Sequence, residues 1–232
     1  MKKEIIHVAN ERRGFIKQVA TGAAALGLAM LAPPFPLQAA PESTGPLDEA
    51  DAWFNKIKGK HRIVFDVTKP DESFPFAWPK VFLLTNAGTG TPESDLGVVV
   101  VLRHNAIPYT MNSGLWQKYK FGEMFKVDDP ATKSPSVRNM FWQPKPDDFK
   151  MPGIGPVAIG INDLQASGVM FCVCNMAITV MSAVAAQKMN KDAGDVYKEW
   201  IAGLLPGIQV VPSGVWAVGR AQEHNCAYCF VG

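Results

Sequence analysis

Four cysteines, Cys172, Cys174, Cys226 and Cys229, are the residues of this chain whose type and spacing are best suited to chemistry. The first two form a C-x-C pattern and the last two a C-x-x-C pattern. Alternate residues of a strand share a face about 6.5–7 Å apart, which is too far for an easy disulfide between Cys172 and Cys174. A disulfide within the C-x-x-C pair, or across to Cys172, is one expectation, and it predicts a non-catalytic structural module.

A metal site is the second way to use these thiols. His224 lies two residues before Cys226, so the two cysteine clusters and an imidazole together offer soft ligands for zinc or copper(I). Such a site requires the third and fifth predicted strands to bring the clusters together. In a sheet ordered 2-1-3-4-5 one strand separates them, which places the clusters roughly 10 Å apart. Zinc or copper binding is therefore an alternative with unfavourable geometry.

Apolar runs alternate with helical patterns along the rest of the chain. Helices are expected over 74–87, 176–189 and 215–223. Five apolar runs are expected to be strands, and the continuous second run is typical of a buried parallel strand; they cover 63–67, 96–102, 168–174, 208–211 and 227–231. The alternation predicts an α/β fold with an open, mostly parallel sheet covered on both faces.

One stretch, 116–155, interrupts this pattern with prolines and interleaved aromatic residues. A loop this long inside a compact domain is usually functional, and its aromatic content argues against disorder. It is expected to form either the wall or lid of a pocket near the strand ends, or a structural cover or subunit contact. Asp66, Asn86 and His104 are weaker candidates at the carboxyl edge of the sheet, where such folds bind ligands.

The C-terminal part, 168–232, resembles the DsrE/DsrF-like family. The resemblance is carried by a strand ending in cysteine, Gly168-Val-Met-Phe-Cys-Val-Cys174-Asn, by Leu204-Leu-Pro-Gly-Ile-Gln-Val-Val-Pro-Ser-Gly214, and by a last strand, Ala227-Tyr-Cys-Phe-Val. It implies a flavodoxin-like three-layer sandwich with a five-stranded, mostly parallel sheet, to which 116–155 is an insertion. It also implies a homo-oligomer, a trimer or hexamer, that relays sulfur as a persulfide to or from a sulfur donor or acceptor protein.

Cys174 is the residue to which the resemblance assigns the sulfur. It ends the third predicted strand just before a helix, and a helix N-terminus offers unsatisfied N–H groups and a partial positive charge that favour a thiolate. The family's sulfur-bearing cysteine lies at a similar strand-to-helix junction. Cys172 would lie deeper on the same face and could only resolve or shield Cys174. The sequence leaves open whether the protein turns over as an enzyme.

Residues 1–40 carry the features of an export signal. Arg12 and Arg13 are followed by Gly, Phe, Ile and Lys, which resembles the twin-arginine motif. The apolar run 19–32 is shorter than the roughly 20 residues of a spanning helix, and small residues near position 40 offer a cleavage site. We expect a periplasmic protein with no stable membrane span after cleavage, and a membrane-anchored one if the signal is uncleaved.

The net charge of +2 belongs to this N-terminal segment. Residues 1–40 hold five of the 23 basic and two of the 21 acidic residues, so the rest of the chain is nearly neutral. Nothing in it predicts a nucleic-acid partner. The expected organisation is a signal over 1–40, a linker with a short amphipathic lead-in over 41–60, and one α/β domain over 61–232.

Overall fold

The computed structural model describes residues 46–146, 148–151 and 153–232. The predicted export segment, including Arg12 and Arg13, lies outside the described residues. Among the helices of the described ranges, none is both long enough and apolar enough to cross a membrane.

The five predicted strands form one parallel sheet, and their limits are confirmed to within two residues. They are β1 (His61–Val67), β2 (Leu96–Leu102), β7 (Met170–Cys174), β8 (Ile208–Val211) and β9 (Ala227–Val231). Their order is β8-β7-β2-β1-β9, so the expected order 2-1-3-4-5 is wrong. The chain adds strands outward from β1 as far as β8 and then returns to place β9 on the other side of β1.

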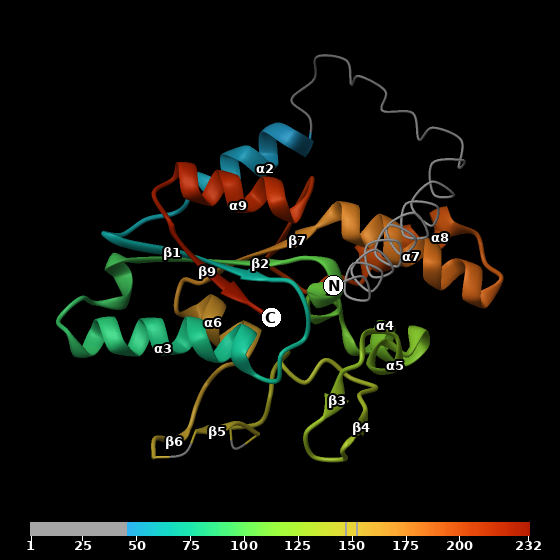
Figure 1. The fold of residues 1–232 in the computed structure, drawn as a ribbon, viewed down its shortest axis with the longest axis horizontal. Helices are drawn as coiled ribbons and strands as arrows, with labels where there is room; N and C mark the ends of the chain where they lie inside the picture. The colour runs from blue at the N-terminus through green and yellow to red at the C-terminus, as the bar shows by residue number, and fades with distance from the viewer. Residues whose placement is uncertain (1–45, 147, 152) are drawn as a thin grey trace, which may run out of the picture. The chain divides into compact units, whose positions relative to one another are not determined.

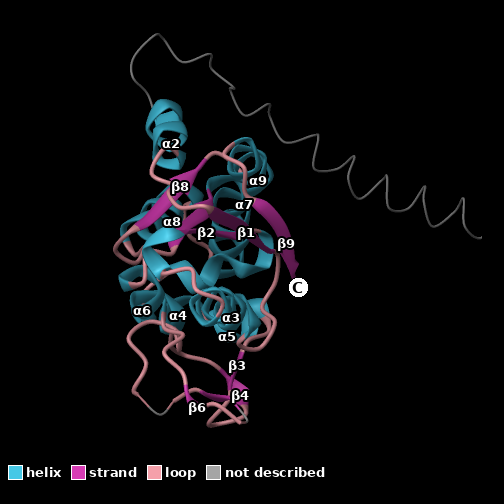
Figure 2. Ribbon diagram, turned by 90° about the vertical axis from the view of Figure 1, so that its left-hand side faces the viewer, coloured by secondary structure: helices cyan, strands magenta, loops and turns pink. Residues whose placement is uncertain are grey.

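Helices cover both faces of this sheet, as Figures 1 and 2 show. One face is covered by α2 (Pro46–Phe54) and α9 (Gly214–Glu223). The opposite face is covered by helices that follow β1, β2 and β7, namely α3 (Phe74–Gly88), α6 (Ile161–Ala166), α7 (Asn175–Met189) and α8 (Ala193–Ala202). The predicted flavodoxin-like, three-layer α/β architecture is confirmed, and the sheet is entirely rather than mostly parallel.

The central strand β2 shows why the sequence folds into these layers. Every residue of β2 is buried. Because side chains alternate along a strand, Val98, Val100 and Leu102 enter the core beneath α3, while Val99 and Val101 enter the core beneath α9. A strand with two buried faces needs a continuous apolar run, which is the pattern from which it was predicted.

The lead-in before β1 belongs to the domain rather than to a linker. Helix α2 buries Ala50 and Phe54 completely against the α9 side of the sheet. Phe54 packs edge-to-face on Trp216 of α9, with ring centroids 5.8 Å apart. The predicted amphipathic lead-in is therefore α2, and its apolar side chains complete one of the two cores of a domain that was expected to begin only at residue 61.

The described residues of the 116–155 insertion, all but positions 147 and 152, form short regular elements. They include the end of α4 (Ser113–Tyr119), α5 (Phe121–Phe125), and two small antiparallel ladders, β3 (Asp128–Asp129) with β4 (Ser134–Pro135) and β5 (Lys150–Met151) with β6 (Gly155–Pro156). Two 3₁₀ helices, η1 (Glu93–Asp95) and η2 (His104–Thr110), flank β2.

The insertion's aromatic residues face the chain's own core. Trp116 and Phe121 are fully buried and Phe141 is 1% exposed. The ring of Phe121 packs edge-to-face on Trp200 of α8, 4.8 Å away between centroids. These three side chains therefore serve the chain's own core, as the expectation of a structural cover requires, and a subunit contact of the insertion stays a prediction.

Candidate functional site at the carboxyl edge of the sheet

Arg103 and Cys174 are placed side by side at the carboxyl edge by strand pairing. Leu102 of β2 pairs with Val173 of β7, so the residues that follow each of them occupy the next position on neighbouring strands. Because side chains alternate along a strand, Arg103 lies on the same face as Val101, and Cys174 on the same face as Cys172. This is the face of the sheet that α9 covers. Adjacent parallel strands lie about 4.8 Å apart, so the backbones of Arg103 and Cys174 are neighbours, and the charge of Cys174 acts on Arg103.

Cys174 stands where the sequence predicted it, at the junction of β7 and the 15-residue helix α7. It is the N-cap residue, and its Sγ accepts a hydrogen bond from the backbone N–H of Ala177 at 3.3 Å. The side chain is 7% exposed. A nearby helix N-terminus supplies N–H donors and a partial positive charge to the sulfur.

Beside it, Arg103 is fixed by a buried carboxylate. Its Nε donates to Oδ1 of Asp66 at 2.6 Å and its Nη2 donates to Oδ2 at 2.9 Å, while the hydroxyl of Tyr228 also donates to Oδ2 at 2.8 Å. Asp66 is only 2% exposed, so water barely reaches its carboxylate. The hydrogen bonds from Arg103 and Tyr228 replace the lost hydration. The hydrogen bond to Asp66 raises the pKa of Arg103, and the charges of Asp66 and Cys174 act in the same direction.

The first turn of α9 closes the other side of the Arg103 stem. A Cβ on Gly214 would lie 2.5 Å from both Cβ and Cδ of Arg103, so only glycine allows the stem to pass. Ser213 caps α9 by accepting from the N–H of Trp216, and the N–H of Met176 donates to the carbonyl of Pro212. The N-termini of α7 and α9 therefore meet at the edge where Arg103 and Cys174 lie.

Sequence reasoning found Cys174 and Asp66 but missed Arg103, Tyr228 and Gly214. One signal was available, because Arg103 directly follows the buried β2 run and so had to emerge at the carboxyl edge. Tyr228 could not be found, since its bond to Asp66 spans 162 positions and depends on β9 pairing with β1.

The remaining cysteines lie in different surroundings, and all four are free thiols in the structure. Cys172 is completely buried, and burial raises its pKa. Burial likewise raises the pKa of Cys226 to about 11 and raises that of Cys229. The structure therefore contains none of the disulfides that the spacing allowed, and Cys172 lies deeper than Cys174, as expected.

The two cysteine clusters are not brought together. Strands β1 and β2 both lie between β7 and β9, so Cys172 and Cys229 are three strand spacings, roughly 14 Å, apart. Cys229 also faces the core on the opposite side of the sheet, and His224 stacks on Phe54. No group of three or more potential ligands among His, Cys, Asp and Glu occurs in the described part of the chain. The residues proposed from the sequence do not form one zinc or copper site.

The other predicted edge residues take no part in this cluster. His104 is an exposed residue at the start of η2. The side-chain amide of Asn86 donates to the carbonyl of Phe82 near the end of α3. From there the chain leads to the amino end of β2. The prediction for Asn86 is wrong because α3 carries it back along the sheet.

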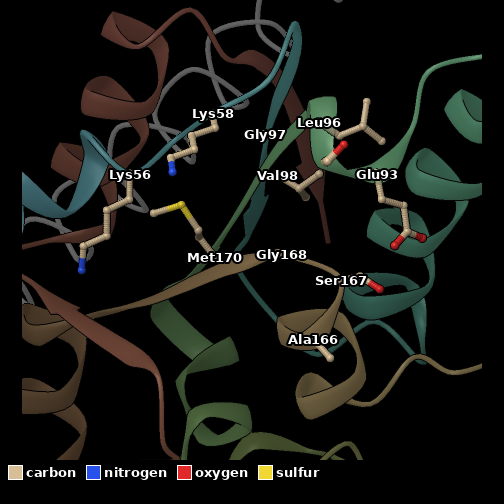
Figure 3. A pocket seen from close by; sticks show the side chains of 11 residues that line it. Lys56, Lys58, Glu93, Leu96, Gly97, Val98, Ala166, Ser167, Gly168 and Met170 are labelled. Atoms are coloured by element: carbon tan, nitrogen blue, oxygen red, sulfur yellow. The ribbon is translucent and has the colours of Figure 1, made fainter.

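A hollow of about 380 Å³, drawn in Figure 3, lies at the amino edge of the sheet. Lys56 and Lys58 line it on one side, and Glu93, Ser167 and Met170 line it elsewhere. It is formed where β2 and β7 begin, so it shares no residue with the Arg103–Cys174 cluster.

Comparisons with known proteins leave this geometry as the main guide to function. No family model matches the chain, and no curated protein matches it. Among solved structures, a protein of unknown function, MTH1491 from Methanobacterium thermoautotrophicum, is similar at 18% sequence identity and a TM-score of 0.38. The match covers 74% of this chain and 100% of the other. A likeness this distant carries no argument about function.

Proposed function

We propose that this chain is an exported sulfur-handling protein of the DsrE/DsrF-like type that carries sulfur as a persulfide on Cys174. The observation that carries the proposal is the position of that thiol. It caps α7, accepts a hydrogen bond from Ala177, and has as a neighbour Arg103, the residue that follows β2. Helix N-termini and cationic neighbours stabilise thiolates and the anionic persulfides formed from them.

The chemistry needs no separate oxidant when the donor is itself a persulfide. The Cys174 thiolate attacks the terminal sulfur of the donor, a new S–S bond forms, the donor's S–S bond breaks, and the donor leaves as a thiolate. Arg103 uses Nε and Nη2 on Asp66, and its Nη1 has no hydrogen-bond partner among the described residues. Nη1 is thus the nitrogen available to an anionic sulfur group.

Sulfur loading on Cys174 is the expected result when the reduced full-length protein is incubated with glutathione persulfide. A small donor is specified because Cys174 is only 7% exposed. Peptide mass spectrometry should find one added sulfur on Cys174, none in Cys174→Ala, and unchanged loading in Cys172→Ala and Cys229→Ala. Loading that persists in Cys174→Ala, or that is confined to Cys229, would refute the assignment.

We also propose that the protein self-associates, and that the contact between copies is formed by α7 rather than by the insertion. Met176, Val180 and Val184 follow one another at intervals of four residues and are 58%, 51% and 38% exposed. Helix α7 carries no charged residue before Lys188, and depletion of charge marks the core of interfaces. Val215 in the first turn of α9 is a further apolar residue, 68% exposed, and it lies three positions after Pro212, whose carbonyl accepts from the N–H of Met176. A second copy of the chain is the occupant that we propose for the apolar face of α7.

Light scattering at micromolar concentration tests this contact. The wild-type protein is expected to be a trimer or hexamer, and Val180→Asp is expected to be a monomer because it places a charge in the middle of the apolar stripe. Val137→Asp is the matched control, since Val137 is 64% exposed but lies in the insertion. A monomeric wild type, or equal dissociation by both variants, would count against the α7 contact.

A further inference from the structure

A second hollow lies between the helices α4 and α5 and the last turns of α7. Its volume is about 400 Å³, within the range of pockets that bind small molecules. Residues 118–124 form one side of it and residues 185–189 form the other. It shares no residue with the Arg103–Cys174 cluster or with the apolar stripe of Met176, Val180 and Val184.

The apolar part of the lining is adaptable. Tyr119 and Ala185 are buried, Met124 is half-buried and Met189 is exposed. Methionine is unbranched and flexible, and such side chains fit apolar groups of varied shape. This part of the hollow therefore suits an alkyl chain, which can follow its surface.

The charged part of the lining consists mainly of lysines. Lys118, Lys120 and Lys188 line the hollow together with one acid, Glu123. Lys120 and Glu123 form an exposed pair 3.5 Å apart, and such pairs contribute little and exchange readily. Lys188, in the last turn of α7, and Lys191, just beyond it, have no ion-pair partner among the described residues.

The other acid beside the hollow, Glu199 of α8, is already occupied. Its Oε1 accepts from Nζ of Lys118 and its Oε2 accepts from the hydroxyl of Tyr119 at 2.6 Å. The hydrogen bond from Lys118, together with that from Tyr119, keeps the pKa of Glu199 below its ordinary value. Nζ of Lys191 lies 5.8 Å from the ring centroid of Tyr119.

The net charge around the hollow is positive. The four lysines Lys118, Lys120, Lys188 and Lys191 face the two acids Glu123 and Glu199, which leaves an excess of two positive charges. The carbonyl ends of α4 and α7 each contribute at most about half an elementary negative charge, so the excess stays positive. An anionic group is therefore favoured next to the apolar lining.

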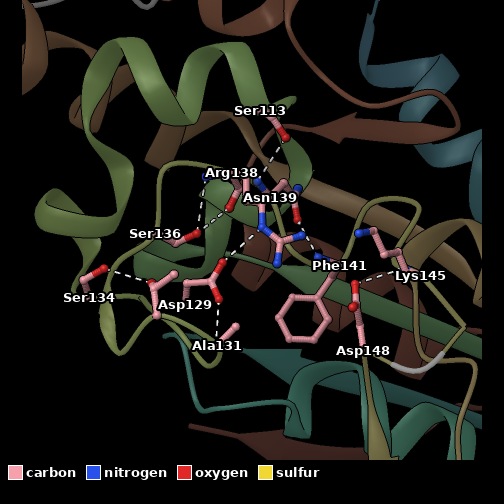
Figure 4. A network of polar contacts seen from close by, with 11 residues as sticks. Ser113, Asp129, Ala131, Ser134, Ser136, Arg138, Asn139, Phe141, Lys145 and Asp148 are labelled. Carbon is pink, nitrogen blue, oxygen red and sulfur yellow. Dashed lines mark hydrogen bonds and ion pairs between the residues drawn. The ribbon is translucent and has the colours of Figure 1, made fainter.

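The wall that carries Lys118 is held in place by the chain itself. In the polar network of Figure 4, the backbone N–H of Asn139 donates to Oγ of Ser113, the first residue of α4, at 3.2 Å. At the other end of α4, Tyr119 packs edge-to-face on Trp200 of α8, with ring centroids 5.5 Å apart. A wall that is fixed before a ligand arrives lowers the cost of binding.

We propose that this hollow binds an amphipathic anion, a molecule with one anionic head and an unbranched alkyl tail. The head lies among Lys120, Lys188 and Lys191, and the tail lies against Met124 and Met189. The concave shape favours a single molecule over the flat face of a membrane. This site is separate from the Cys174 chemistry and does not depend on it.

Calorimetric titration of the full-length protein with sodium decanoate, below the concentration at which it forms micelles, tests the proposal. Lys188→Gln/Lys191→Gln removes two exposed charges and should weaken binding about fivefold at low salt. Lys56→Gln/Lys58→Gln is the matched control, because it removes the same charge from the hollow at the amino edge of the sheet, and it should bind like the wild type. Val180→Asp should also bind like the wild type, which separates this site from the proposed contact between copies.

Two further probes separate the head from the tail. Decanol, which keeps the tail but is uncharged, should bind more weakly than decanoate and equally to the wild type and Lys188→Gln/Lys191→Gln. Acetate, which keeps only the head, should show no measurable binding. Added salt should weaken decanoate binding to the wild type more than to the double variant, because salt screens exposed charges.

Three results would overturn the proposal. The first is no binding of decanoate to the wild type, or binding that Lys188→Gln/Lys191→Gln leaves unchanged. The second is an equal loss of binding in Lys56→Gln/Lys58→Gln or in Val180→Asp, which would place decanoate elsewhere on the molecule. The third is binding to phosphatidylglycerol vesicles that depends on Lys188 and Lys191 when decanoate binding does not, which would make this surface a membrane contact.

Discussion

Replacing Arg103 by alanine is expected to lower the free energy of unfolding by about 3 kcal/mol. The reason is the carboxylate left behind. Asp66 is 2% exposed and would keep only the hydroxyl of Tyr228 as a partner in place of a two-point contact with a guanidinium. An uncompensated buried charge costs far more than the pair itself contributes.

Changing the other partner, Asp66→Asn, should lower the free energy of unfolding by less, about 1–2 kcal/mol. The reason is that the side chain of Arg103 is 26% exposed, so water can hydrate the guanidinium that loses its carboxylate. Lysine at position 103 keeps the charge but loses the forked geometry, so Arg103→Lys should fall between the wild type and Arg103→Ala. Urea denaturation of the three variants and of the double variant Asp66→Asn/Arg103→Ala gives the coupling energy. Equal losses for Arg103→Ala and Asp66→Asn, with no coupling, would show that Asp66 is not held as the structure describes.

Alanine at position 122 should be nearly as damaging, at about 3 kcal/mol, although it adds a single methyl group. Gly122 lies in α5 with the chain of the β4 segment directly against it. A Cβ there would lie 2.7 Å from the carbonyl carbon of Pro135 and closer still to the backbone N and O of Ser136. Backbone cannot rotate away as a flexible side chain can, so α5 and β4 would have to separate.

Gly219→Ala is the matched control for this effect. Gly219 lies within α9, and a Cβ there meets nothing within 4 Å. This variant should be more stable than the wild type by about 0.5–1 kcal/mol, since alanine is the better helix former. Denaturation curves for both variants would decide the question. A Gly122→Ala protein as stable as the wild type would mean that the insertion does not pack in this way.

The amino-acid sequence by itself determined the strands and the position of Cys174, because both follow from local patterns. The limits of β2, Leu96–Leu102, were predicted without error, since a strand buried on both faces must be apolar throughout. Cys174 was placed at a strand-to-helix junction by the apolar run that ends there and the helical pattern that follows.

Strand order was decided only by the tertiary structure. An apolar run shows that a strand is buried but does not identify its neighbours, so the pairing of β9 with β1 could not be read from the sequence. That pairing joins Tyr228 to Asp66 and keeps Cys226 and Cys229 away from Cys172 and Cys174.

The packing of the insertion was likewise decided only by the tertiary structure. Its aromatics were visible in the sequence, but whether they packed inward or against another subunit depended on surfaces that α8 and α3 supply, as the contacts of Phe121 with Trp200 and of Phe141 with Phe76 show.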